Sequence, residues 1–273
     1  EDYYPFALNM TTDRSVYEAT AVGNRHICFI SPTQHAPSNA SGYNFGGFGE
    51  NGSAEGLAMS DWTYVGEVIS HEFGHCMGLV HSDQISQNYY RGHGYWAPIM
   101  GNNYYRTLTT WDQGEFVNAK YTDDNAESLS PSHWSLAQKR AFYIDKTLII
   151  STTRKADNSI VGFRADDHGS TISTATILQR TGENILSENN NGIISESSDL
   201  DFFTFTLSKN SSVNLRANVN EIAPNLNIEF KLYDGSGTLL KTINEDGYDN
   251  LSAILNTTLA AGTYYISIDG AGE

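Results

Sequence analysis

The chain after residue 165 is dominated by short runs in which apolar and polar residues alternate. A period of two is typical of strands that bury one face, and clusters of turn-forming residues such as Asp234-Gly235-Ser236-Gly237 separate the runs. The predicted strands cover residues 201–207, 213–217, 228–233, 239–243 and 263–268. Several short strands at this spacing predict an all-β sandwich over residues 165–273.

A helical spacing takes over in the first half of the chain. Apolar residues recur three and four positions apart from Trp62 to Phe73, which predicts a helix that Ser60 or Asp61 caps and Gly78 ends. Residues 1–145 are predicted to form one domain and residues 146–164 a polar linker. Weaker patterns predict strands at 6–9, 26–30 and 57–59, a Gly/Asn/Ser-rich loop at 38–55, a helix to residue 21 capped by Asp13, a helix opened by a capping box at Thr110 and reaching Ala119, and a helix at 135–143.

The predicted helix between the Ser60 or Asp61 cap and Gly78 carries residues that can bind and use a metal ion. His71 and His75 are four positions apart, so their imidazoles lie on one helix face. Glu72 beside them suits the general base that takes a proton from metal-activated water. Gly78 permits a sharp turn that returns His81 as a third ligand. Three protein ligands leave one position open, which is typical of a catalytic zinc rather than a structural one.

The residues from His71 to His81 match H-E-x-x-H-x-x-G-x-x-H at every fixed position and so resemble the metzincin metallopeptidases. The amino-acid sequence near Met100 and after Trp111 most resembles that of reprolysin-like peptidases among secreted bacterial proteins. This resemblance implies an α+β catalytic domain with a mixed sheet, a zinc helix and a Met-turn. Met100, within Ala97-Pro98-Ile99-Met100-Gly101, looks like that Met-turn.

The same resemblance implies two further features of a substrate cleft. The strand before the zinc helix would border the cleft and pair with an extended substrate, and its residues here are Gly56, Leu57, Ala58 and Met59. A plain edge strand is the alternative. Some metzincins place a tyrosine two residues after the methionine, where this chain has Asn102, so no tyrosine ligand of that type is expected. Tyr104 and Tyr105 are candidates to line the cleft.

The second half resembles the bacterial pre-peptidase C-terminal domain. The resemblance rests on fragments that occur in the expected order: Ala165-Asp166-Asp167-His168-Gly169, Asp199-x-Asp201-Phe202-Phe203, Leu232-Tyr233-Asp234 and Gly262-Thr263-Tyr264-Tyr265. It implies an accessory substrate-binding or secretion-related module, which in related sandwiches binds insoluble matrix such as collagen, sometimes with calcium. Asp199 and Asp201 are candidate Ca²⁺ ligands because calcium prefers hard oxygen donors. A solvated acidic turn is the alternative.

The chain contains two cysteines, Cys28 in a predicted strand and Cys76 in the predicted zinc helix. If that strand lies beneath the helix, a disulfide between them would join the sheet to the helix. The alternative is two buried free thiols, which pack as small apolar groups.

The net charge of the chain restricts the classes of partner that it is expected to bind. Its 16 basic and 32 acidic residues give a formal charge of −16, and the basic residues form no cluster. Binding to nucleic acid or to an anionic membrane is therefore not expected. No apolar run reaches the roughly 20 residues that span a bilayer. We expect a secreted, extracellular protein whose upstream leader has been removed, supplied either as a fragment or as a mature form trimmed at both ends.

Together these features predict a secreted zinc endopeptidase that hydrolyses peptide bonds in protein or peptide substrates, with Glu72 as general base. The alternative from another class is a non-catalytic binding or adhesion protein whose zinc only braces the fold. An intact Glu72 favours the enzyme, because a purely structural site has no use for a general base.

Overall fold

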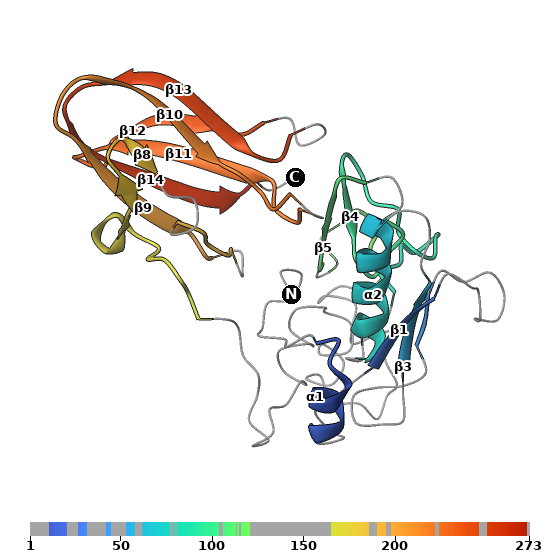
Figure 1. The fold of residues 1–273 in the computed structure, drawn as a ribbon. Coiled ribbons are helices and arrows are strands. Elements are labelled where there is room, and N and C mark those ends of the chain that lie inside the picture. Colours follow the sequence, from blue (N-terminus) through green and yellow to red (C-terminus); the bar gives the residue numbers. More distant parts are fainter. Residues whose placement is uncertain are drawn as a thin grey trace. The chain divides into compact units, whose positions relative to one another are not determined.

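The computed structural model describes two compact units, one that runs to Phe163 and one that begins at Arg164. The described residues are 11–20, 27–31, 42–44, 53–57, 62–76, 79, 81–103, 106–112, 114, 116–120, 165–185, 190–194, 198–221, 224–245 and 250–271. Strands hold most of their regular structure, with two α-helices in the first unit (Figure 1). Within this part of the chain no helix is long and apolar enough to span a bilayer. The predicted linker, the strand at 6–9 and the helix at 135–143 lie outside the described residues.

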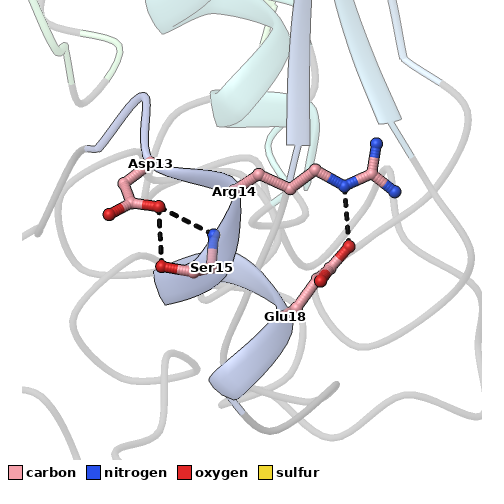
Figure 2. Close-up of polar contacts among 4 residues, drawn as sticks. All are labelled: Asp13, Arg14, Ser15 and Glu18. Atoms are coloured by element: carbon pink, nitrogen blue, oxygen red, sulfur yellow. Dashed lines mark hydrogen bonds and ion pairs between the residues drawn. The ribbon is translucent and has the colours of Figure 1, made fainter.

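Helix α1 (Arg14–Ala19) is stabilised at its start by the residue before it, which binds a free backbone N–H of the first turn. The Asp13 carboxylate accepts hydrogen bonds from the backbone N–H of Ser15 at 2.8 Å and from its hydroxyl at 2.7 Å (Figure 2). Arg14 and Glu18 form an exposed ion pair one turn apart at 2.6 Å. The prediction that Asp13 caps this helix is confirmed, although the helix ends at Ala19 instead of residue 21 because Thr20 adopts an extended conformation.

A three-stranded sheet precedes the long helix. Its strands are β1 (Ile27–Ser31), β2 (Gly42–Asn44) and β3 (Ser53–Leu57), in the order β1-β3-β2. β3 pairs in parallel with β1 and antiparallel with β2. The loop predicted at 38–55 therefore contains strands, and the strand predicted at 57–59 lies four residues too late. Backbone pairing tolerates the glycines of this segment, so the composition gave the wrong prediction here.

Helix α2 (Trp62–Cys76) packs against β3 and β2. The predicted helix over these residues is confirmed, and the side chains described run from residue 66 to residue 74. Within that stretch the buried positions are Glu67, Ser70, Glu72 and Gly74, whereas Val68, Ile69 and Phe73 are only half-buried. Among the described side chains of this helix, the buried positions are therefore small or polar.

Two short parallel strands, β4 (Trp96–Pro98) and β5 (Leu108–Thr110), follow α2. The helix predicted from Thr110 to Ala119 is wrong, because the described residues there form turns. Gly114 and Asn118 have φ values of 79° and 57°, which a right-handed helix excludes. The Asp112 carboxylate accepts the Gly114 N–H at 2.9 Å and replaces the helical bond.

The C-terminal unit is built mainly from two sheets (Figure 1). Buried residues of both sheets form one apolar core. A five-stranded sheet has the order β12-β11-β14-β9-β6, and β10 and β13 form the second sheet. The principal strands are β9 (Asp201–Leu207), β10 (Ser211–Ala217), β11 (Ile228–Asp234), β12 (Leu239–Ile243), β13 (Ala253–Leu259) and β14 (Gly262–Gly270). Buried residues alternate along β9 and β11, so the predicted β-rich character of this half is confirmed.

Some smaller elements of this unit have no periodic pattern in the sequence that predicts them. They are a short 3₁₀ turn (Ile172–Thr174), β6 (Thr176–Ile177), β7 (Arg180–Thr181) and β8 (Asn184–Ile185). β6 adds a parallel strand to β9, and β7 pairs with β8. The segment that leads into β6 also brings residues 166–170 beside β9, where the Phe202 N–H donates to the Gly169 carbonyl at 3.0 Å.

Candidate metal centre

His71 and Glu72 stand next to each other in the third turn of α2. The His71 ring nitrogen Nδ1 lies 2.8 Å from the carbonyl oxygen of Ile99. A carbonyl only accepts hydrogen bonds, so Nδ1 must donate, and the lone pair of this imidazole is then on Nε2. A backbone carbonyl that orients a histidine in this way is the usual outer support of a metal ligand.

His81 lies near His71 although it follows the end of α2. The two imidazole rings have centroids 5.3 Å apart. Two imidazoles that bind one tetrahedral ion at about 2.1 Å have ring centroids about 5 Å apart. The His71 and His81 rings therefore fit a shared zinc ion. The backbone of His75 lies in the last turn of α2, and its side chain is outside the described residues.

The end of α2 explains how the chain returns His81 to the helix. The Leu79 N–H donates to the Gly74 carbonyl at 3.0 Å, a bond that spans five residues. This bond belongs to the helix-ending motif in which glycine is favoured at the residue before the donor. That residue is Gly78 in the sequence, and it is itself outside the described residues.

Met100 lies on a tight turn against the same helix. The Gly101 N–H donates to the Pro98 carbonyl at 3.0 Å, and Met100 is 0 % exposed. A methyl group added to Gly74 would overlap the Met100 sulfur. Met100 therefore packs directly on the α2 backbone one residue before His75.

Backbone hydrogen bonds tie the segment after His81 to this turn. The Ser82 N–H donates to the Met100 carbonyl at 2.9 Å, and the Tyr90 N–H donates to the Ser82 carbonyl at 2.8 Å. The Ser82 hydroxyl donates to the Asp112 carboxylate at 2.5 Å, and both residues are buried. The Asn102 N–H donates to the Tyr90 carbonyl at 2.8 Å. Tyr104 and Tyr105 lie outside the described residues.

The two buried glutamates of α2 differ in their surroundings. Burial raises the pKa of Glu72 to about 7, and Glu72 is 7 % exposed. The Glu67 carboxylate, one turn earlier, accepts a hydrogen bond from the Thr109 hydroxyl at 3.4 Å and so contacts β5. A pKa near neutrality suits a group that exchanges protons during a reaction.

Tyr89 is a residue of this site that the sequence analysis missed. Its ring centroid lies 3.9 Å from that of His81 and 6.4 Å from that of His71. Burial raises the pKa of Tyr89, and the charges of Glu72 and Asp83 raise it further. No periodicity or motif marks this position, because the contact depends on the irregular path of the chain after α2.

The structure corrects the expected substrate strand. Gly56 pairs with Ile30 of β1 on one side and with Gly42 of β2 on the other. A central strand has no free edge at that position, so a substrate cannot add to the backbone of Gly56. Leu57 ends β3 opposite Ser31, while Ala58 and Met59 lie outside the described residues. The Cys28 and Cys76 side chains also lie outside the described part, so their disulfide stays a prediction.

The C-terminal unit brings four carboxylates together near the start of β9. One group whose ligand atoms lie within 4.8 Å of one another consists of Asp166, Asp199 and Asp201, and a second consists of Asp167, His168 and Asp201. Asp199 and Asp201 are the calcium ligands that the sequence predicts. Asp166 and Asp167 are more than thirty residues away in the sequence, and only the fold places them here.

His168 is a poor ligand, which favours the group made of oxygen donors. Its Nε2 lies 2.9 Å from the Asn191 carbonyl and must donate to it. Its Nδ1, 3.0 Å from the Thr176 hydroxyl, is then the acceptor. Both nitrogens are occupied within the protein, so carboxylates remain as the ligands. An all-oxygen set suits calcium.

Asp201 belongs to both groups of candidate ligands and is buried. It is 2 % exposed, and its Oδ1 has no hydrogen-bond partner in the described structure. Its other oxygen is so close to Gly192 that any side chain at position 192 would collide with it. Burial raises the pKa of Asp201 to about 7, and the charge of Asp167 contributes next. A buried carboxylate with an unused oxygen fits the binding of a cation.

The chain matches two family models. Residues 14–96 match the model described as Peptidase M66, a range that contains α2 and His81. Residues 199–270 match the bacterial pre-peptidase C-terminal domain, a range that contains β9 to β14. A comparison with curated proteins finds no match. The two family matches support a peptidase that carries a pre-peptidase C-terminal domain.

Proposed function

We propose that the protein is a secreted zinc endopeptidase of the metzincin type, with an α+β catalytic domain that resembles reprolysin-like enzymes. The observation that carries this proposal is the convergence of the His71 and His81 rings beside the buried Glu72, above the Met100 turn. The match to a peptidase family over residues 14–96 supports the reaction class. The finer assignment rests on the eleven-residue motif and on this geometry.

In this proposal His71, His75 and His81 hold the zinc ion. When bound, zinc polarises the scissile carbonyl and lowers the pKa of water. Glu72 takes a proton from the attacking water and passes it to the leaving amine. Its burial favours this exchange, because a carboxyl with a pKa near 7 can be both acceptor and donor close to neutral pH. The Ile99 carbonyl keeps Nε2 of His71 directed away from the Met100 turn and available to a metal.

We also propose that Asp166, Asp199 and Asp201 bind calcium, with Asp167 near them. The buried, unpartnered Oδ1 of Asp201 supports this second site. Calcium there would join the start of the C-terminal unit to β9 and stabilise that unit, with no part in the chemistry. This unit would serve as an accessory module for substrate binding or secretion, and insoluble matrix such as collagen is the partner class that its family suggests.

The proposed disulfide depends on the proposed extracellular location. An acidic, extracellular protein has oxidising surroundings in which Cys28 and Cys76 can form a disulfide. Such a bond would join β1 to the last residue of α2. Mass mapping of the unreduced protein tests it, and free thiols at both positions would contradict it.

The direct test of function is a digest of a peptide library, read by mass spectrometry with and without a zinc chelator. We expect internal peptide bonds to be cleaved, cleavage to stop with chelator, and added zinc to restore it. The residues that the cleaved peptides share around the broken bond would also define the specificity. A protein that binds zinc tightly but cleaves nothing in the library, in casein or in collagen would contradict the proposal and favour a zinc-braced binding or adhesion protein.

A further inference from the structure

Two adjacent tyrosines follow the candidate metal ligand His81, and they are held very differently. Tyr90 is 8 % exposed and stacks on Phe116, with ring centroids 4.2 Å apart. Tyr89 is 43 % exposed and has a φ of 55°. The left-handed conformation of Tyr89 turns its side chain away from the Tyr90 core and over His81.

The backbone of Tyr89 is fixed in this uncommon conformation by several contacts. Its N–H donates to the Asp83 carboxylate at 2.8 Å. Asp83 is itself 8 % exposed, and Lys120 binds it twice, through Nζ at 3.4 Å and through its backbone N–H to the Asp83 carbonyl at 2.7 Å. A left-handed tyrosine costs on the order of 1 kcal/mol and persists only where the surroundings impose it. Such positions are concentrated at functional sites.

The ring that this conformation presents lies against an imidazole. The Tyr89 and His81 centroids are 3.9 Å apart with planes at 37°, and the His71 ring is 6.4 Å from Tyr89 with planes at 15°. His71 lies on α2 and its ring is oriented by the Ile99 carbonyl. His81 lies on an irregular segment, where no regular backbone sets the direction of its side chain.

We propose that Tyr89 is a positioning residue, whose aromatic ring holds the His81 imidazole in the orientation that binds zinc. This inference rests on the proposed zinc function. The ring carries the role, and the hydroxyl is not needed for it. Packing against His81 removes rotamers of the imidazole before the metal arrives, so less conformational entropy is lost on binding. Outer supports of metal ligands typically contribute 10- to 100-fold in metal affinity.

The test measures zinc affinity by competition with a chromophoric chelator, on full-length protein first stripped of metal. Tyr89→Phe keeps the ring. Tyr89→Asn and Tyr89→Gly remove it with residues that tolerate a positive φ, so the backbone conformation is preserved. Ile85→Asn is the matched control, since Ile85 is 74 % exposed in the same segment. Two ring-removing variants protect the test against one that fails to fold, which circular dichroism would detect.

We expect Tyr89→Asn and Tyr89→Gly to weaken zinc binding by about 10-fold or more. Tyr89→Phe and Ile85→Asn should bind zinc as the wild type does. Equal zinc affinity in wild type and the ring-removing variants would overturn the inference. A Tyr89→Phe variant as weak as Tyr89→Asn would overturn it too, because the hydroxyl would then be responsible. Wild-type protein that binds no zinc would instead overturn the proposed function.

Discussion

The two candidate metal sites of this chain have different kinds of ligand, imidazoles in one and carboxylates in the other. In the first unit, imidazoles from one helix and the segment after it converge beside a buried glutamate. In the second unit, aspartates from the segment before β6 and from the start of β9 converge beside a close-packed glycine. The first set suits zinc and the second suits calcium.

The difference between the two sites indicates their roles. In the proposed zinc site Glu72 is not needed as a ligand, so it is available to exchange protons. Asp201 is enclosed by the protein, and its Oδ1 has no hydrogen-bond partner among the described residues. We therefore assign chemistry to the first site and stabilisation to the second.

The largest effect is expected from His81→Ala. Loss of one of three ligands should reduce zinc content well below one ion per chain and lower turnover by on the order of 10³-fold or more. Calcium stabilisation of the C-terminal unit should not change. Metal content by mass spectrometry and peptide turnover measure both effects. His93→Ala is the control, because His93 is exposed and bonded to the Tyr90 hydroxyl outside the centre. Equal losses of zinc and of turnover in both variants would contradict the assignment of His81 as a ligand.

A pH dependence is expected from Asp201 in calcium-free protein. The unfolded chain loses this proton near pH 4, whereas the folded unit retains it to about pH 7. The unfolded state therefore binds fewer protons between these values, so stability should fall as pH rises from 4 to 7, by on the order of 3 kcal/mol. Asp201→Asn should flatten this contribution, as measured by denaturant unfolding. A profile that is the same in both proteins would show that Asp201 does not titrate in this range.

Calcium should restore the stability that the C-terminal unit loses when Asp201 ionises. At pH 7.5 and a calcium concentration 100 times the dissociation constant, the free energy of unfolding should rise by about 2.7 kcal/mol. Asp201→Asn should abolish the rise. Glu183→Gln should not, since Glu183 has an exposed side chain in the same unit. Thermal unfolding with calcium and with magnesium measures the effect. An undiminished rise in Asp201→Asn would place calcium elsewhere.

A smaller effect is expected where Met100 meets α2. Gly74→Ala introduces a methyl group that overlaps the Met100 sulfur and crowds Trp111 and Leu79. Overpacking of this kind should destabilise the first unit by about 2 kcal/mol. Gly66→Ala on the same helix has open space and should be neutral or slightly stabilising. Denaturant unfolding compares the two. Equal stability of both variants would show that Met100 does not pack on the helix.

The predictions from the sequence were accurate where one periodic pattern determined the structure. Strands β9, β11 and β12 were predicted within one residue of their ends, because their alternation matches one buried face. Helix α2 was predicted from its spacing, but the close packing of Gly74 against the Met100 turn was not, since that contact joins distant segments. β13 was missed although Ala253, Leu255 and Leu259 are buried, because Asn256 and two threonines follow the short apolar run.

The sites show the same limit. The motif predicts His71, Glu72 and His81 as site residues because their spacing is local to one helix and its end. Tyr89 was missed, because an irregular segment returns it to His81 and no pattern encodes that path. Asp166 was not recognised as a partner of Asp201, because a contact between distant segments depends on the assembled fold. β2 and β3 were read as loop because backbone pairing dominates in a glycine-rich strand.

The most direct measurement of the central claim compares Glu72→Gln with Glu67→Gln. Both changes replace a buried carboxylate of α2 by a neutral side chain of the same shape. We predict that both variants keep about one zinc per chain, that Glu67→Gln cleaves peptides at close to the wild-type rate, and that Glu72→Gln loses nearly all turnover. A zinc-loaded Glu72→Gln protein that still cleaves peptides as the wild type does would contradict the assignment.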